Sequence, residues 1–230
     1  MAEILAIFGL RLIGRALLAP TMLATPSVLS ARCVGADIPI VAQAELETGR
    51  DPANAVGWIN NAIAITGPAE RRTIASLYLV QSIAYSMSGQ DASPAIEAAT
   101  KIAASFTTDD PIRLFLKLTP ISRIKDELKR TRIVDEVASV QSRLPDGSEI
   151  KTCLGVDIAY WKSYDEAFHE AFEFASHAYR NLHDKRNTRA RAEAASILAY
   201  IVAEGHQFDY SEQLQSEALS FFTAKELYDL

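Results

Sequence analysis

The stretch from Arg71 to Ala104 most constrains what this chain can fold into. Two segments with apolar residues at helical spacing flank Gly89, and Ser93-Pro94 opens the second. Gly is favoured just past a helix end, Ser as a helix cap and Pro at the first helical position. The stretch therefore predicts a helical hairpin. Four small residues favour close approach of its two helices: Ala84, Ala95, Ala98 and Ala99.

Helix-start patterns recur along the chain. Asp51-Pro52 predicts a helix that ends near Ile65, and Asp109-Asp110-Pro111 predicts another, which Pro120 is expected to kink or split. Pro68 is expected at the first position of the helix that contains Arg71. Each start follows a break in the apolar pattern, so that the chain is divided into units of similar size.

The second half continues the pattern. Pro145-Asp146-Gly147-Ser148 predicts the strongest turn and a plausible subdomain boundary. Ser163-Tyr-Asp-Glu166 matches a capping box, which predicts a helix from 164 to 182. Asn187 or Thr188 is expected to cap the next helix, and Thr223-Ala-Lys-Glu226 a short last one.

These units predict an all-α fold. No segment alternates apolar and polar residues as a half-buried strand would. We count five helical hairpins at a period of roughly 34–46 residues, and one hairpin of this size cannot bury its own apolar face. Residues 37–230 are therefore expected to form stacked antiparallel helical hairpins, a short right-handed α-solenoid.

The net charge of the chain limits the classes of partner that we expect. The chain has 230 residues, 49% of them hydrophobic, and a formal net charge of −6. A folded core is therefore expected, and the acidic balance argues against nucleic acid as a partner.

Residues 1–36 resemble a secretory signal. Arg11 and Arg15 precede an uncharged run over 16–31, and Val34-Gly35-Ala36 offers small residues for cleavage. The run is short and broken by proline, so a lasting membrane span is not expected. We expect export, to a periplasm, with only transient membrane contact. The alternative is that this segment is the apolar first helix of a cytoplasmic protein.

Cys153 stands in an apolar helical context. We interpret it as a small buried side chain, since a nucleophile would need a nearby histidine that the sequence does not offer. Cys33 approaches a lipidation pattern, but Arg32 occupies the position that requires a small residue.

Ala84-Tyr85-x3-Gly89 followed by Ala95-Ile96 resembles the core of a tetratricopeptide repeat, and Ala159-Tyr160 with Asp165-Glu166-Ala167-Phe168 is similar. The period is longer than in that family, and two extra residues separate Gly89 from Ala95. The resemblance implies a right-handed α-solenoid whose concave groove binds a protein or peptide. It implies no chemistry and no cofactor.

One helix gathers ionisable residues: Glu166, His169, Glu173 and His177 share a face at spacings of three and four. Zinc would suit this set, but the two histidines are about 12 Å apart along the helix axis. We therefore expect a solvated face and no metal site. An all-α enzyme that uses this face of the helix 164–182 is the alternative.

Aromatic and basic residues supply the candidate partner-binding set: Trp58, Trp161, Tyr164, Arg186 and Arg189. Exposed aromatic side chains often anchor partners. The basic residues near 185–191 have few acidic neighbours, whereas those from Lys125 to Arg132 are interleaved with acids, which predicts an exposed, salt-bridged helix. Phe168 and Phe172 are expected in the core.

The function expected from the sequence is therefore non-enzymatic, with no catalytic residue and no cofactor. We expect an exported scaffold or adaptor that binds other proteins. A cytoplasmic regulatory repeat module is a further alternative.

Overall fold

The computed structural model describes residues 38–182 and 188–228, without the side chains of residues 122, 123, 188–190 and 221–228. Within these ranges the chain forms ten α-helices and no strand. The predicted all-α fold is confirmed. The helices pack against their neighbours in chain order, which is compatible with a helical-repeat fold.

Two compact units divide the chain between Ile158 and Ala159, within one helix. The first contains α3 (Pro39–Arg50), α4 (Pro52–Ile65), α5 (Arg71–Met87), α6 (Ser93–Ala103), α7 (Pro111–Leu118), the 3-10 helix η1 (Thr119–Arg123), α8 (Glu127–Gln141) and the start of α9 (Glu149–Tyr164). The second contains the end of α9, α10 (Phe168–Asn181), α11 (Thr188–Glu204) and α12 (Phe208–Tyr228). The turn at 145–148 lies between α8 and α9.

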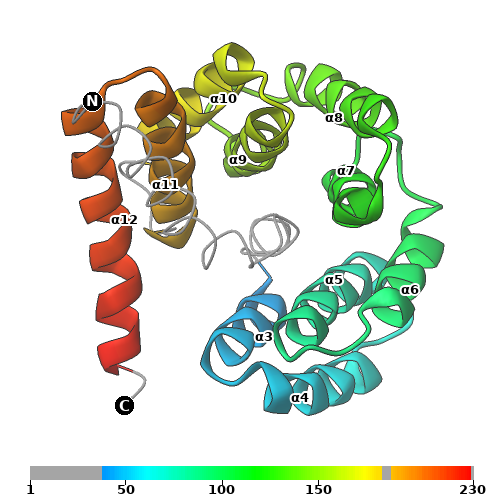
Figure 1. Cartoon of the computed structure of the whole chain (residues 1–230). Coiled ribbons are helices and arrows are strands. Elements are labelled where there is room, and N and C mark those ends of the chain that lie inside the picture. The colour runs from blue at the N-terminus through cyan, green and yellow to red at the C-terminus, as the bar shows by residue number, and fades with distance from the viewer. Residues whose placement is uncertain (1–37, 183–187, 229–230) are drawn as a thin grey trace. The chain divides into compact units, whose positions relative to one another are not determined.

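In the first unit, α5 packs against α3, α4 and α6 (Figure 1). The core between α3, α4 and α5 combines Ile59, Leu77 and Val80 with alanines. Ala44 and Ala84 are fully buried at this contact. On α6, Ala95 and Ala99 are buried as well, whereas Ala98 is half-buried. Because a methyl group lets helix backbones approach closely, these alanines explain why the helices nest as predicted.

Proline marks several helix starts, as expected. Asp51 accepts a hydrogen bond from Asn54 N at the start of α4, and Asp110 accepts one from Ile112 N at the start of α7. Both caps satisfy an amide that the helix itself leaves unpaired. Pro120 ends α7 and lies in η1, which confirms the predicted split.

Two start predictions were wrong. Pro68 lies in a turn closed by Glu70 N and Gly67 O, and α5 begins only at Arg71. Ser93 is the first residue of α6 and not its cap; the side chain of Asp91 accepts from Ser93 N instead. Relative to the proline pattern, α5 begins three residues later and α6 begins one residue earlier.

Gly89 ends α5 as predicted. Its φ is +72°, Gln90 N donates to Tyr85 O at 2.8 Å, and Gly89 N donates to Ser86 O at 3.2 Å. This is a Schellman motif, in which a left-handed residue allows two amides to satisfy the last carbonyls of the helix.

The same motif ends α9 and α11 without glycine. Glu166 and His206 have positive φ, Ala167 N donates to Lys162 O, and Gln207 N donates to Val202 O. The capping box predicted at Ser163 to Glu166 was therefore wrong: Ser163 lies inside α9, Glu166 terminates it, and α10 begins at Phe168.

In the second unit, α11 lies between α10 and α12 (Figure 1). The buried residues of α10 are three alanines, Ala171, Ala175 and Ala178, which face the neighbouring helix at spacings of four and three. The break predicted at Thr223 is wrong, because α12 continues to Tyr228. Asn187, the other candidate cap of α11, lies outside the described residues; α11 begins at Thr188.

Candidate functional site

Trp58 supports the core of the first unit. It lies on α4, is half-buried, and packs against the cluster that contains Ile59 and Leu77. Its ring therefore has a structural role, and only part of it is exposed to a partner.

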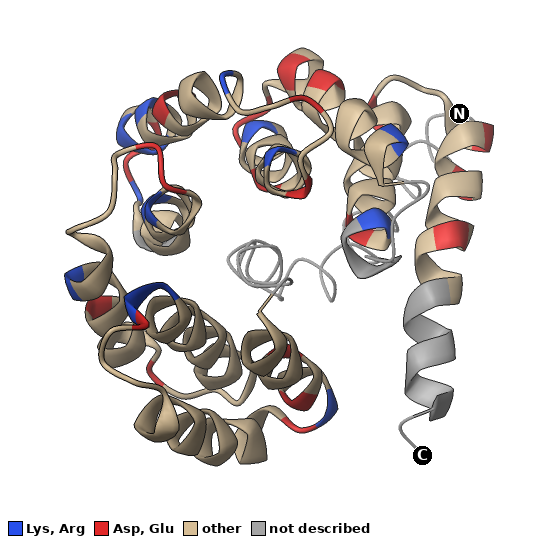
Figure 2. Cartoon of the chain, turned by 180° about the vertical axis from the view of Figure 1, so that it is seen from behind, with Lys and Arg blue, Asp and Glu red and all other residues tan. Residues whose placement is uncertain are grey.

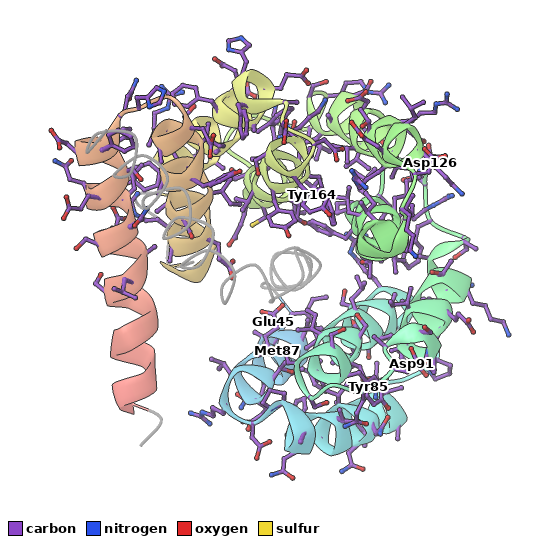
Figure 3. The ribbon with its side chains drawn as sticks, viewed as in Figure 1. Glu45, Tyr85, Met87, Asp91, Asp126 and Tyr164 are labelled. Atoms are coloured by element: carbon purple, nitrogen blue, oxygen red, sulfur yellow. The ribbon has the colours of Figure 1, made fainter. Side chains whose placement is uncertain are left out.

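Trp161 and Tyr164 lie together at the end of α9. Trp161 is 4% exposed, whereas Tyr164 is 59% exposed. Their ring centroids are 5.7 Å apart in an edge-to-face arrangement, and Tyr160 lies 5.1 Å from Trp161 on the same helix. Burial, followed by the nearby Tyr164, raises the pKa of Tyr160. Tyr164 is labelled in Figure 3, at the end of α9. Of this pair, Tyr164 offers the accessible surface.

Arg186 lies outside the described residues, and Arg189 is placed only by its backbone in α11. Their neighbour Arg191 is described and is engaged within the unit. Its Nε donates to Glu217 Oε1 at 2.6 Å, and another guanidinium nitrogen donates to Tyr179 Oη at 2.9 Å. The guanidinium carbon also lies 4.2 Å from the centre of the Tyr179 ring.

Tyr179, Arg191 and Glu217 form a polar clamp that joins α10, α11 and α12. Tyr179 Oη donates to Glu217, and burial together with this carboxylate raises the pKa of Tyr179 to about 12. A hydrogen bond to an ionised partner contributes more than a neutral one. The clamp therefore holds three helices at one end of the unit, and its pairs are 12 to 38 residues apart in sequence.

The four ionisable residues predicted to share one helix face are exposed, but they do not all belong to the same helix. His169, Glu173 and His177 lie on α10, while Glu166 lies in the preceding turn, and all four are exposed. Among the described residues, no group of three or more His, Cys, Asp or Glu side chains is arranged to hold a metal ion.

Arg130 of α8 also differs from expectation. It was predicted on an exposed, salt-bridged helix face, but it is buried and donates to Ile124 O.

A shallow groove lies where the start of α10 meets the end of α11. Its volume is 360 Å³. The apolar part of the lining comes from two aromatic and two aliphatic side chains, and the polar part from the rim: Phe168, Phe172, Ile201, Val202, His169, Glu204, Gly205 and Gln207. The Phe168 ring also contacts the Tyr200 ring edge-to-face, with centroids 6.0 Å apart.

This groove corrects the expectation that Phe168 and Phe172 are core residues. Phe172 is 38% exposed, and Phe168 is half-buried along the groove wall. Their i, i+4 spacing fits either role. The alanines at 171, 175 and 178 were the signal that the buried face of α10 is elsewhere, because they occupy a different helical stripe.

A smaller groove of 210 Å³ lies between α6 and α7 in the first unit. Arg113 and Lys117 line it beside Ala103 and Leu116. Lys117 pairs with Glu136 of α8, and Arg113 donates to Phe106 O. Both cations are thus engaged by the protein, so this groove is a weaker candidate.

Large apolar side chains are also exposed outside the grooves. In the first unit, Leu46 on α3 and Met87 on α5 are 58% and 40% exposed, and Figure 3 labels Met87 together with Glu45 of α3.

Cys153 on α9 is 2% exposed, as predicted. It is not a free thiol, so it offers no nucleophile.

No protein-family model matches the sequence, and no curated protein and no solved structure is significantly similar to it. Among the described residues, none of the helices combines the length and the apolar character needed to cross a bilayer.

Proposed function

We propose that this chain is a non-enzymatic helical-repeat protein that binds another protein or a peptide as a scaffold or adaptor. The observation that carries the proposal is the apolar groove of the second unit, in which Phe172 remains 38% exposed beside Ile201 and Val202. Exposed apolar side chains that are gathered in a groove often mark a protein-interaction site.

The repeat architecture we propose is a right-handed stack of five antiparallel hairpins, from α3 with α4 to α11 with α12. A spacing of 40 residues supports it. Ala159-Tyr160 and Ala199-Tyr200 occupy equivalent places, as do Glu166 and His206, and Phe168 and Phe208 each begin the following helix. Repeats of this kind stack because one hairpin cannot bury its own apolar face.

Affinity capture from a native extract tests the binding function. The full chain is the bait, and the matched bait carries Tyr164→Ser and Phe172→Ser, which change exposed aromatic side chains and leave the buried Trp161 intact. We expect at least one protein that the wild-type chain enriches and the double variant loses, and that binds the purified chain directly. Equal recovery of every protein by both baits would contradict the aromatic surface.

We further propose that the protein is exported and cleaved after Ala36. The support is the basic, apolar and small-residue order within residues 1–36. Intact-mass measurement of the protein from the periplasmic fraction tests this. A chain that begins at Asp37 lacks Cys33 and keeps Cys153, so its mass differs from that of the uncleaved chain by the whole of residues 1–36. An intact Met1 in that fraction would contradict cleavage.

A further inference from the structure

We propose that the groove between α10 and α11 binds a short cationic peptide segment, in which large apolar side chains are flanked by Lys or Arg. This inference rests on the binding function proposed above and names the chemistry of the partner. Three observations carry it: the size of the groove, its lining, and the charge of the surrounding surface.

The groove fits side chains and not a folded domain. Its 360 Å³ is at the lower end of the range of small-ligand sites. Phe168 and Phe172 come from the first turns of α10, and Ile201 and Val202 from the last turn of α11. One or two apolar side chains of a peptide can therefore bury their surface there while the peptide backbone stays at the rim.

The rim is acidic. Glu204 lines the groove directly. Glu166, Glu170 and Glu173 are exposed at the start of α10, and Asp209 and Glu212 are exposed at the start of α12, which adjoins the same end of α11. Figure 2 shows acidic residues on α10 and along the first half of α12.

Basic residues are missing from the same stretches. Residues 163–179 and 192–224 contain no Lys or Arg. Lys162 precedes the first stretch, but its Nζ is 2.5 Å from Glu170 and its side chain is 7% exposed. Among the residues whose side chains are described, the other Lys or Arg residues of this unit are Arg180, near the end of α10, and Arg191, near the start of α11.

Acidic residues at helix starts also interact favourably with the helix dipole, so their presence alone identifies no site. Here Glu204 lines an apolar groove, and the other acidic residues lie at the helix ends next to it, in stretches that contain no Lys or Arg. A potential of one sign around a groove steers and selects partners of the opposite sign. An acidic peptide or an anionic surface would be repelled, which is why we commit to a cationic segment.

The test uses the full chain and three labelled peptides of equal length. The first has a Leu-Phe centre with Lys flanks, the second the same centre with Glu flanks, and the third Lys flanks with a Ser-Gly centre. Fluorescence anisotropy gives each Kd at low and high salt. We expect tight binding of the first peptide alone, weakened by salt because the charges are exposed.

Variants locate the binding. Phe172→Ala should raise the Kd at least about fivefold, and Glu204→Gln should raise it about threefold. Leu219→Ala is the matched control, because Leu219 is 63% exposed on α12 and does not line the groove. Circular dichroism checks the fold of each variant, and Glu204→Gln provides the test if Phe172→Ala fails to fold.

Several outcomes would overturn the inference. They are equal binding of the Glu-flanked peptide, an unchanged Kd in both groove variants, and an equal loss in Leu219→Ala. Self-association that Phe172→Ala abolishes would assign the groove to a second copy of the chain. If no peptide binds while a captured protein still binds the purified chain, the cationic-peptide inference fails and the proposed function stands; if neither binds, both fail.

Discussion

Glu166 and His206 have the same left-handed backbone conformation at equivalent places, with φ of 59° and 60° at the ends of α9 and α11. Non-glycine residues adopt this conformation at a cost of roughly 1–2 kcal/mol. Each allows the following amide to close a Schellman motif, after which a phenylalanine begins the next helix.

Glu166→Gly should therefore stabilise the protein. The gain from relieving the backbone, less the greater freedom of glycine in the unfolded chain, is about 0.5–1 kcal/mol. Chemical denaturation followed by circular dichroism measures it. Glu173→Gly is the control, since it places glycine inside α10 and should cost about 1 kcal/mol. A loss of stability in both variants would contradict the proposed strain at Glu166.

Two glycine-to-alanine substitutions should have opposite effects. A Cβ at Gly57 or at Gly89 would meet no atom within 4 Å, so crowding affects neither. Gly57 lies inside α4, where alanine should stabilise by about 1 kcal/mol, whereas Gly89 has φ of +72°, where alanine should destabilise by a similar amount. Thermal unfolding of the two variants in parallel would show Tm shifts of opposite sign; shifts of the same sign would be evidence against the Schellman motif at Gly89.

High pH should weaken the second unit through Tyr179. Burial, followed by the hydrogen bond to Glu217, raises the pKa of Tyr179 to about 12 from an ordinary value near 10. The folded state then keeps a proton that the unfolded state releases, so stability is complete below pH 10 and falls as the pH rises towards 12. Denaturation curves at several alkaline pH values measure this fall, which should be smaller in Tyr179→Phe.

Replacing Arg191 by Lys should destabilise the clamp although the charge is kept. Only the planar guanidinium donates to Glu217 and Tyr179 together while lying over the ring. We expect a loss of about 1–2 kcal/mol in the free energy of unfolding. Arg180→Lys on α10 is the matched control, because Arg180 is exposed. If the two variants lose the same amount, the clamp contributes nothing specific.

Ala62 and Ala64 test the close approach of helices in the first unit. Ala62 is 3% exposed in the core, whereas Ala64, on the same helix, is exposed. Ala62→Leu should cost about 1–3 kcal/mol through overpacking, and Ala64→Leu should change little. Urea denaturation of both variants measures the difference. Tolerance of leucine at both positions would mean that the helices do not nest on alanine.

Local signals explain which parts of the fold were predictable. Asp51-Pro52 and Asp110-Pro111 begin helices as expected, because a cap and a proline act within one turn. Ser163 to Glu166 matches a capping box by spacing alone, yet the segment ends a helix, since glutamate gives no local sign that its backbone will be left-handed. The helix break predicted at Thr223 is wrong for a related reason, because a capping pattern that lies inside a helix does not by itself end that helix.

The candidate site could not be predicted in the same way, because it depends on contacts between residues that are far apart in the sequence. The position of Arg191 opposite Glu217 requires two helices to be packed, and no local pattern indicates it. The groove also requires Phe172 of α10 to lie beside Ile201 and Val202 of α11 while the alanines of α10 are buried. Trp161 shows the opposite case. An aromatic side chain of this kind often binds a partner, but here the surrounding residues bury it.

The alanine stripe of α10 has a consequence for recognition. Three methyl groups remove little apolar area from water, and the Tyr179 clamp lies near the other end of α10 from Phe172. We therefore expect the first turns of α10 to open at a lower free energy than global unfolding. We expect such opening to widen the groove beside Phe172. Ligands that differ in bulk can therefore share one binding place, and selectivity will depend more on charge than on shape.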